Sequence, residues 1–204
     1  MKITAIKKSK KGNILIYADG VYLASVFPEV FFKHNLKIGD YIDSDILKNL
    51  TEEVNINKAK EKALKILSLR AHSKKELENK ITRTIGSEYA KKATEKMESL
   101  GLINDKEFAI SYAKELIFRK FHSTARVRFE LAEKGFSDDI INSVIDEINP
   151  NEEENIKNIL EIRYFSKGKN LKDEKEFRRA VAYCQRLGYQ WSQIKRVVDF
   201  FDNE

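Results

Sequence analysis

The alternation of apolar and polar residues divides the chain into a short β-rich part followed by a long helical part. Residues 14–27, ILIYADGVYLASVF, form two β-rich runs around Asp19-Gly20, and an Asp-Gly pair favours the positive φ angles of a two-residue hairpin turn. The segments MKITAIKK and LKIGDYID can add strands, and Pro28 starts a short helix that reaches Asn35. This pattern predicts a small β-rich domain of about four strands.

In the long second part the apolar positions follow the helical period, and one helix face recurs. A face with apolar residues at i, i+3, i+4 and i+7 begins at Ile141 and again at Ile194, 53 residues later. Gly135 and Gly188 precede the two faces with the same shift, and a fainter copy begins at Ala93. The two complete faces are Ile141, Val144, Ile145 and Ile148, and Ile194, Val197, Val198 and Phe201. The repeating unit is therefore about 50 residues long.

Within each unit the pattern predicts three helices. Their expected ranges are 59–69, 73–85 and 87–100, then 105–119, 124–134 and 138–148, and finally 152–164, 173–187 and 191–201. We accordingly expect a β-rich domain at 1–55 and helical repeats at 56–102, 103–149 and 150–204. A unit of three helices buries little by itself, so neighbouring copies should stack. The predicted fold class is mainly α, with tandem three-helix repeats in an elongated, curved array after a small β-rich N-terminal domain.

Capping residues support these helix boundaries. Ser73 with Glu76, and Asn104 with Glu107, have the spacing of a capping box. Ser137 can cap the helix of Ile141 in the simpler way. Two glycines, Gly86 and Gly135, lie where a helix should end in a left-handed residue.

The composition predicts a basic, folded protein without a membrane span. The chain has 204 residues, 42% of them hydrophobic, and a formal net charge of +6. An acidic partner is consistent with this charge. The single cysteine, Cys184, cannot form an intramolecular disulfide, and no apolar run is long enough for a signal peptide or a membrane span. We expect a cytoplasmic protein.

No motif in the sequence indicates an enzyme. There is no Gly-rich phosphate loop before a Lys-Ser/Thr pair and no His-Glu-x-x-His, and one cysteine cannot form a thiolate metal site. His72 and His122 recur at the same point of two units, but the third unit lacks a histidine, which favours loop residues over ligands. Phe108 and Tyr112 are expected in the core rather than on a stacking platform. We therefore predict no catalytic residue, no metal and no cofactor.

Basic residues gather around the joint between the first and second helix of each unit. Stacked repeats present equivalent joints along one edge, so these charges predict a positive stripe suited to a phosphate backbone or an acidic protein groove. The alternative is an ordinary solvated surface, because Lys and Arg fill exposed helix positions in most proteins. The candidate residues are Arg70, Lys74 and Lys75; Arg119, Lys120, Arg126 and Arg128; and Lys167, Lys169, Lys172, Arg178 and Arg179.

Three motifs in order resemble the bacterial regulatory protein family RecX. The first is an Arg-x-x-Ser-x-x-Glu-Leu stretch, the second a Gly-to-Phe-Ala junction, and the third a Glu-Leu-x-x-Lys-Gly segment. Here they are Arg70, Ser73, Glu76 and Leu77; residues 101–109; and Glu130, Leu131, Lys134 and Gly135. The match covers about residues 59–148, and the β-rich start resembles an N-terminal extension of some Gram-positive members.

The resemblance implies a non-enzymatic modulator of the recombinase RecA. Members of this family bind the RecA filament on single-stranded DNA, are thought to lie along its groove, and reduce strand exchange, ATP hydrolysis and coprotease activity. They thereby restrain recombination and the SOS response. The alternative is a sequence-nonspecific module that binds single-stranded DNA itself and acts by competition. A nuclease is disfavoured because no carboxylate cluster recurs at the motif positions. We expect a monomer, because repeat stacking already buries the apolar seam within one chain.

Overall fold

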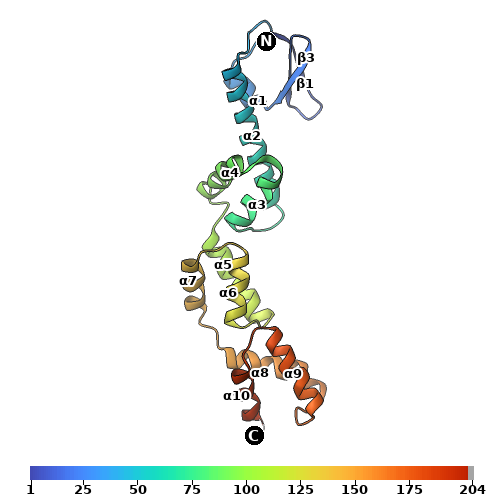
Figure 1. The fold of residues 1–204 in the computed structure, drawn as a ribbon, viewed down its shortest axis with the longest axis vertical. Coiled ribbons are helices and arrows are strands. Elements are labelled where there is room, and N and C mark those ends of the chain that lie inside the picture. Colours follow the sequence, from blue (N-terminus) through green and yellow to red (C-terminus); the bar gives the residue numbers. More distant parts are fainter. Residues whose placement is uncertain (202–204) are drawn as a thin grey trace. The chain divides into compact units, whose positions relative to one another are not determined.

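The computed structural model describes residues 1–201, which are mostly helical with a small sheet near the N-terminus (Figure 1). The chain packs as two compact units. The first comprises residues 1–71 and 77–103, and the second comprises residues 72–76 and the chain from Asn104 onward. The short segment 72–76 therefore packs with the second unit, although its flanking residues belong to the first.

An antiparallel three-stranded sheet in the order β1-β2-β3 opens the first unit. Its strands are β1 (Ile3–Lys8), β2 (Ile14–Ala18) and β3 (Val21–Val26). Ala18 pairs with Val21 across the predicted hairpin turn, in which Asp19 and Gly20 have φ angles of 49° and 83°. The hairpin prediction is confirmed.

The expected fourth strand is not formed among the described residues. The segment after the hairpin makes an isolated bridge between Lys2 and Tyr41, because a turn at Gly39, with φ of 100°, interrupts the extended conformation. Ile42 is nevertheless buried with Ile3 in the core of this domain. The segment covers the edge of β1 as a loop rather than as a strand.

The helices begin with α1 (Pro28–Lys33), which starts at the predicted proline, and α2 (Ser44–Leu67). The helix expected from residue 59 begins at Ser44, since the Asp43 side chain accepts hydrogen bonds from the first free amides. Its first half buries Leu50 in the β-rich domain and its second half buries Ala63 in the first repeat. Among the described residues, no helix is both long and apolar enough to cross a membrane.

The nine predicted repeat helices are all present. The second half of α2 with α3 (Lys74–Ile85) and α4 (Ser87–Ser99) forms the first repeat. The second repeat has α5 (Asp105–Lys114), which continues as the π-helical turn η1 (Glu115–Arg119), then α6 (Thr124–Glu133) and α7 (Asp138–Ile148). The third has α8 (Glu152–Arg163), a short 3₁₀ turn η2 (Phe165–Lys167), α9 (Glu174–Arg186) and α10 (Trp191–Phe201).

Each repeat has its own apolar core, and the recurring faces lie inside it. Ile141 and Ile194 are both buried, each in the core of its own repeat. Phe108 and Tyr112 pack against the second core, as expected. In the fainter first copy Leu100 is exposed because it caps the end of α4. The side chain of Phe201 lies outside the described part of the structure.

The predicted caps are formed, with one correction. Ser73 and Ser137 accept hydrogen bonds from the amides of Glu76 and Ile140, and Asn104 accepts one from that of Glu107. Gly135, with φ of 81°, ends α6 as predicted. Gly86 follows the end of α3 directly with a positive φ of 121°, but its ψ of 154° lies outside the left-handed helical region, and the same residue is also the N-cap of α4.

Candidate functional site

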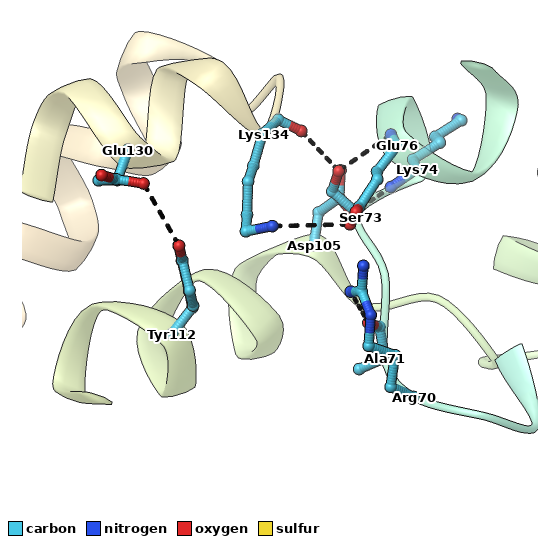
Figure 2. Close-up of polar contacts among 9 residues, drawn as sticks. All are labelled: Arg70, Ala71, Ser73, Lys74, Glu76, Asp105, Tyr112, Glu130 and Lys134. Atoms are coloured by element: carbon cyan, nitrogen blue, oxygen red, sulfur yellow. Dashed lines mark hydrogen bonds and ion pairs between the residues drawn. The ribbon is translucent and has the colours of Figure 1, made fainter. Parts of the chain in front are cut away.

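The joint before α3 is fixed by contacts with the second repeat, all within the second unit. The Ser73 hydroxyl donates to the Lys134 carbonyl at 2.6 Å, while Ser73 Oγ accepts from the Glu76 amide at 3.1 Å (Figure 2). The Lys74 amide donates to Asp105 Oδ1 at 2.8 Å. Two orphan amides of the first turn of α3 are thus satisfied, one of them by the following repeat.

The same arrangement recurs before α6, where the following repeat is the third. The Ser123 amide donates to the Leu187 carbonyl at 2.9 Å, and Ser123 Oγ accepts from the Arg126 amide at 3.2 Å. The Thr124 amide donates to Glu152 Oε1 at 2.6 Å. An acid at the first residue of the next repeat, Asp105 in α5 or Glu152 in α8, therefore accepts the first helical amide in both joints.

The two glycines that recur 53 residues apart face these joints. A Cβ atom built on Gly135 would lie 2.6 Å from Lys75 Cβ, and one on Gly188 would touch Ser123 Oγ and lie 2.9 Å from Arg126 Cβ. Only a glycine lets the next repeat approach so closely. We call this repeated contact of serine, acid and glycine turn the seam, with Ser73, Asp105 and Gly135 in one copy and Ser123, Glu152 and Gly188 in the other.

The two recurring histidines lie in the loops just before the seam serines. His72 is buried, and His122 is half-buried with Nδ1 lacking a hydrogen-bond partner. Burial lowers the pKa of His122, and the nearby Arg126 and Lys120 charges lower it further against an opposing effect of Glu130. Among residues 1–201, no three His, Cys, Asp or Glu side chains are placed to hold a metal ion.

Half of the twelve predicted basic residues have polar side-chain partners nearby. Lys120 pairs with Glu115 at 3.0 Å, and the hydrogen-bonded lysine lowers the pKa of that carboxyl. In the third repeat Lys169 and Arg179 both pair with one carboxylate, Glu176, whose pKa is lowered chiefly by Lys169. The other partnered residues are Arg126 with Glu130, Arg128 with Asn142, and Arg178 with Glu174.

The remaining predicted residues divide into two groups. Lys75, Arg119, Lys167 and Lys172 have no ion pair among the described residues and are exposed. Arg70 donates to the Ala71 carbonyl, and Lys74 is held through its amide. Whether the twelve form one stripe stays a prediction.

Two of the predicted groups meet around a tyrosine of α9. Arg119 and Lys120 line a cavity of about 400 Å³, and Arg179 lines a neighbouring cavity of about 640 Å³. Arg163 and Tyr183 line both cavities, and Arg186 lines the larger one. Sequence reasoning missed Arg163, Tyr183 and Arg186. The available signal was the helical spacing of Arg179, Tyr183 and Arg186 at i, i+4 and i+7, which places them on one face.

Comparison with known proteins shows which proteins the chain is similar to. A family model described as "RecX, second three-helix domain" matches residues 104–145, which span α5, η1, α6 and most of α7. Regulatory protein RecX of Clostridium acetobutylicum is 28% identical over 202 residues, which cover 97% of this chain and 93% of that protein. Regulatory protein RecX of Clostridium tetani is 29% identical over 206 residues, with the same coverage. Over nearly its whole length the chain is therefore similar to proteins named regulatory protein RecX.

Solved RecX structures share this fold. A crystal structure of regulatory protein RecX superimposes with a TM-score of 0.69 at 21% identity, covering 97% of this chain and 98% of that one. RecX from Lactobacillus salivarius gives a TM-score of 0.56 at 20% identity over 74% of this chain. The curated relatives of this chain are thus named as regulatory proteins.

The RecX motifs acquire a structural meaning from the seam. Ser73 and Glu76 of the first motif form the capping pair, and Lys134 and Gly135 of the third motif supply the carbonyl and the turn that receive it. The two motifs are therefore the two halves of one contact in the second unit. The ion pair of Lys134 Nζ with Glu76 at 3.8 Å links them once more (Figure 2).

Proposed function

We propose that this chain is a cytoplasmic, monomeric regulator of the RecX family that binds the RecA filament on single-stranded DNA. It would mainly reduce the ATPase, strand-exchange and coprotease activities of RecA, and so restrain recombination and the SOS response. It would act by binding rather than by catalysis. The name shared by its relatives supports a regulatory role, and the family resemblance supplies the partner.

The observation that carries this proposal is the repetition of the seam. Each seam holds the start of a second helix against the next repeat, so that basic side chains such as Lys75 and Arg126 leave from fixed positions. A filament presents one surface many times, and repeated weak contacts on one chain add in binding free energy. A repeated basic surface is suited to such a lattice.

The test is single-stranded-DNA-dependent ATP hydrolysis by RecA during titration with substoichiometric amounts of this protein. Binding to the bare DNA is followed in parallel at the same salt concentration. Hydrolysis should fall well before the protein could saturate the DNA. A fall that begins only where bare DNA is already occupied would favour the second candidate, competition for the strand.

Charge reversal tests the surface itself. Lys167→Glu with Lys172→Glu changes two exposed lysines that lack an ion pair among the described residues, so folding should be unaffected. Inhibition should weaken in this variant but not in Lys195→Glu, an exposed lysine of the same repeat outside the joint. Reversal of Arg126 is less informative because its stem packs against Gly188 in the seam. If the wild type, the Lys167→Glu/Lys172→Glu variant and the Lys195→Glu variant inhibit RecA equally, the third joint is not part of the interface.

A further inference from the structure

The two cavities that meet at Tyr183 have a composition that no structural role explains. The smaller is lined by Arg119, Lys120, Phe121, His122, Ile159, Ile162, Arg163, Tyr183 and Leu187, and the larger by Arg163, Tyr164, Arg179, Ala182, Tyr183, Gln185 and Arg186. None of these lining residues is acidic, although the chain has 32 acidic residues. The two cavities therefore form a basic hollow in the second unit.

Three guanidinium groups in this hollow lack a carboxylate partner. Arg119, Arg163 and Arg186 form no ion pair among the described residues, in contrast to Arg178 and Arg179 farther toward the start of α9. Unpaired guanidinium groups that gather at one place repel one another, and an anion bound between them relieves that repulsion. Their planar donors match the oxygens of a phosphate group.

Tyr183 positions two of the three arginines. Arg163 Cζ lies 4.0 Å and Arg186 Cζ 5.6 Å from the centre of its ring. A guanidinium group that lies over a ring keeps its N–H donors free at its edge. The ring thus aligns the arginines and leaves their positive charge available. A carboxylate partner would neutralise that charge.

The backbone at the rim of the hollow is unusual and firmly held. The Lys120 amide donates to the Glu115 carbonyl at 3.2 Å in the π-helical turn that ends at Arg119, and Phe121 has a left-handed φ of 55°. The Tyr189 hydroxyl donates to the Phe121 carbonyl at 3.0 Å and fixes this conformation. π-Turns and left-handed non-glycine residues occur often at functional sites. Here they present Arg119 and Lys120 at the cavity.

We propose that the hollow formed by Arg119, Arg163, Tyr183 and Arg186 binds single-stranded nucleic acid. The guanidinium groups contact phosphate oxygens, and a base lies against the tyrosine ring or the apolar floor that Ile159, Ile162 and Leu187 provide. The floor favours a nucleic acid over an acidic protein segment, because carboxylates need only the charges whereas bases also need apolar and aromatic surface. Ile162 is 54% exposed and available for such a contact.

The inference deepens the proposed function by giving one site for the strand within the filament, and it rests on that function for its biological setting. Its test needs no RecA. The anisotropy of a fluorescein-labelled oligothymidylate is titrated with the full chain at several salt concentrations. If the full chain does not bind the bare strand but still inhibits RecA, the inference that the hollow binds nucleic acid is wrong while the proposed regulatory function stands.

Two variants separate the roles of charge and ring. Arg163→Gln with Arg186→Gln should weaken binding about tenfold or more and lower the slope of log K against log salt by about 1.4, since each phosphate contact on a single strand contributes about 0.7. Tyr183→Leu should weaken binding about five- to 150-fold by loss of stacking and of arginine alignment, with a smaller change in slope. Arg196→Gln is the matched control, because it removes an exposed arginine charge of the same repeat outside both the lining and the twelve candidate residues.

The outcomes decide the inference. Weakening by both hollow variants with little effect of Arg196→Gln supports the inference. Equal weakening by all the arginine variants would indicate general charge attraction and overturn it. Wild-type strand binding by the hollow variants, together with weaker capture of RecA filaments, would make the hollow a protein contact instead. Far-ultraviolet circular dichroism and Trp191 fluorescence confirm that each variant is folded.

Discussion

Gly188 should tolerate substitution poorly, because it combines a positive φ with the close approach of the seam. Its φ is 96°, and an added Cβ would touch Ser123 Oγ and lie 2.9 Å from Arg126 Cβ and 3.4 Å from the Arg126 amide nitrogen. These atoms cannot move freely, since the Ser123 amide is bonded to the Leu187 carbonyl. Gly188→Ala therefore strains the turn and forces the two repeats apart.

The expected magnitude follows from two separate costs. A left-handed conformation costs an L-residue about 1–2 kcal/mol. Overpacking at a well-packed contact adds about 1–3 kcal/mol. Gly168→Ala is the matched control: Gly168 has a φ of 66° and open space around its Cβ position, so only the first cost applies. The free energy of unfolding should fall by about 1–3 kcal/mol more in Gly188→Ala than in Gly168→Ala.

Urea unfolding followed by Trp191 fluorescence measures this difference. Trp191 is the sole tryptophan of the chain and lies edge-on to Phe177, with ring centres 6.0 Å apart, in the third repeat. Its fluorescence reports on the unit that contains Gly188, which matters because two units need not unfold together. Equal destabilisation by the two alanine substitutions would show that the seam accommodates the added Cβ atom without a loss of unfolding free energy, and would refute the reasoning.

Three further predictions follow from the joints and the core. Ser73→Ala removes the cap of α3 and the donor to the Lys134 carbonyl, and should destabilise the protein by about 1–3 kcal/mol in the same urea titration; no change would mean that water replaces both bonds. Because the pKa of His122 is lowered by folding, the unfolded chain binds the proton more readily, so stability should fall as the pH drops from about 6.5 toward the folded-state value; His122→Gln should remove this component, and an unaltered pH profile would contradict it. Burial raises the pKa of the Cys184 thiol to about 11, so a thiol reagent at about pH 8 should modify it only after urea unfolding, and rapid labelling of the native protein would contradict that burial.

The sequence predicts the repeats well because helical period and capping are local properties. Ser73, with Glu76 three residues later, marks a helix start whatever lies around it. The start of α2 was missed, since polar and β-branched residues such as Thr51 and Val54 weaken the helical pattern there. The second role of Gly86, as the N-cap of α4, was missed because a glycine before a helix and a glycine after one look alike in sequence.

The candidate site was predictable only in part, because pairing across repeats leaves no local pattern. Arg119 and Arg179 were found from their place at the joints. The pair of Arg179 with Glu176 has the i, i+3 spacing of one helix, but nothing in the sequence shows that Arg119 lacks an ion pair among the described residues. Arg163 and Tyr183 come from different helices, and their contact at 4.0 Å depends on packing. The π-helical turn before Lys120 likewise has no sequence signal of its own.

In both copies of the seam the serine donates a hydrogen bond to the next repeat, and the equivalent residue of the third repeat differs. The Ser73 hydroxyl donates to the Lys134 carbonyl of the next repeat, and the Ser123 amide donates to the Leu187 carbonyl. The equivalent N-cap of α9 is Asp173, whose ionised carboxylate can only accept and whose amide is already bonded to the Asn170 carbonyl at 3.2 Å. If another glycine turn packed at this position, its backbone carbonyl would face the Asp173 carboxylate, and both groups are hydrogen-bond acceptors. At Asp173 the third repeat therefore lacks the hydrogen-bond donor that Ser73 and Ser123 provide in the seam.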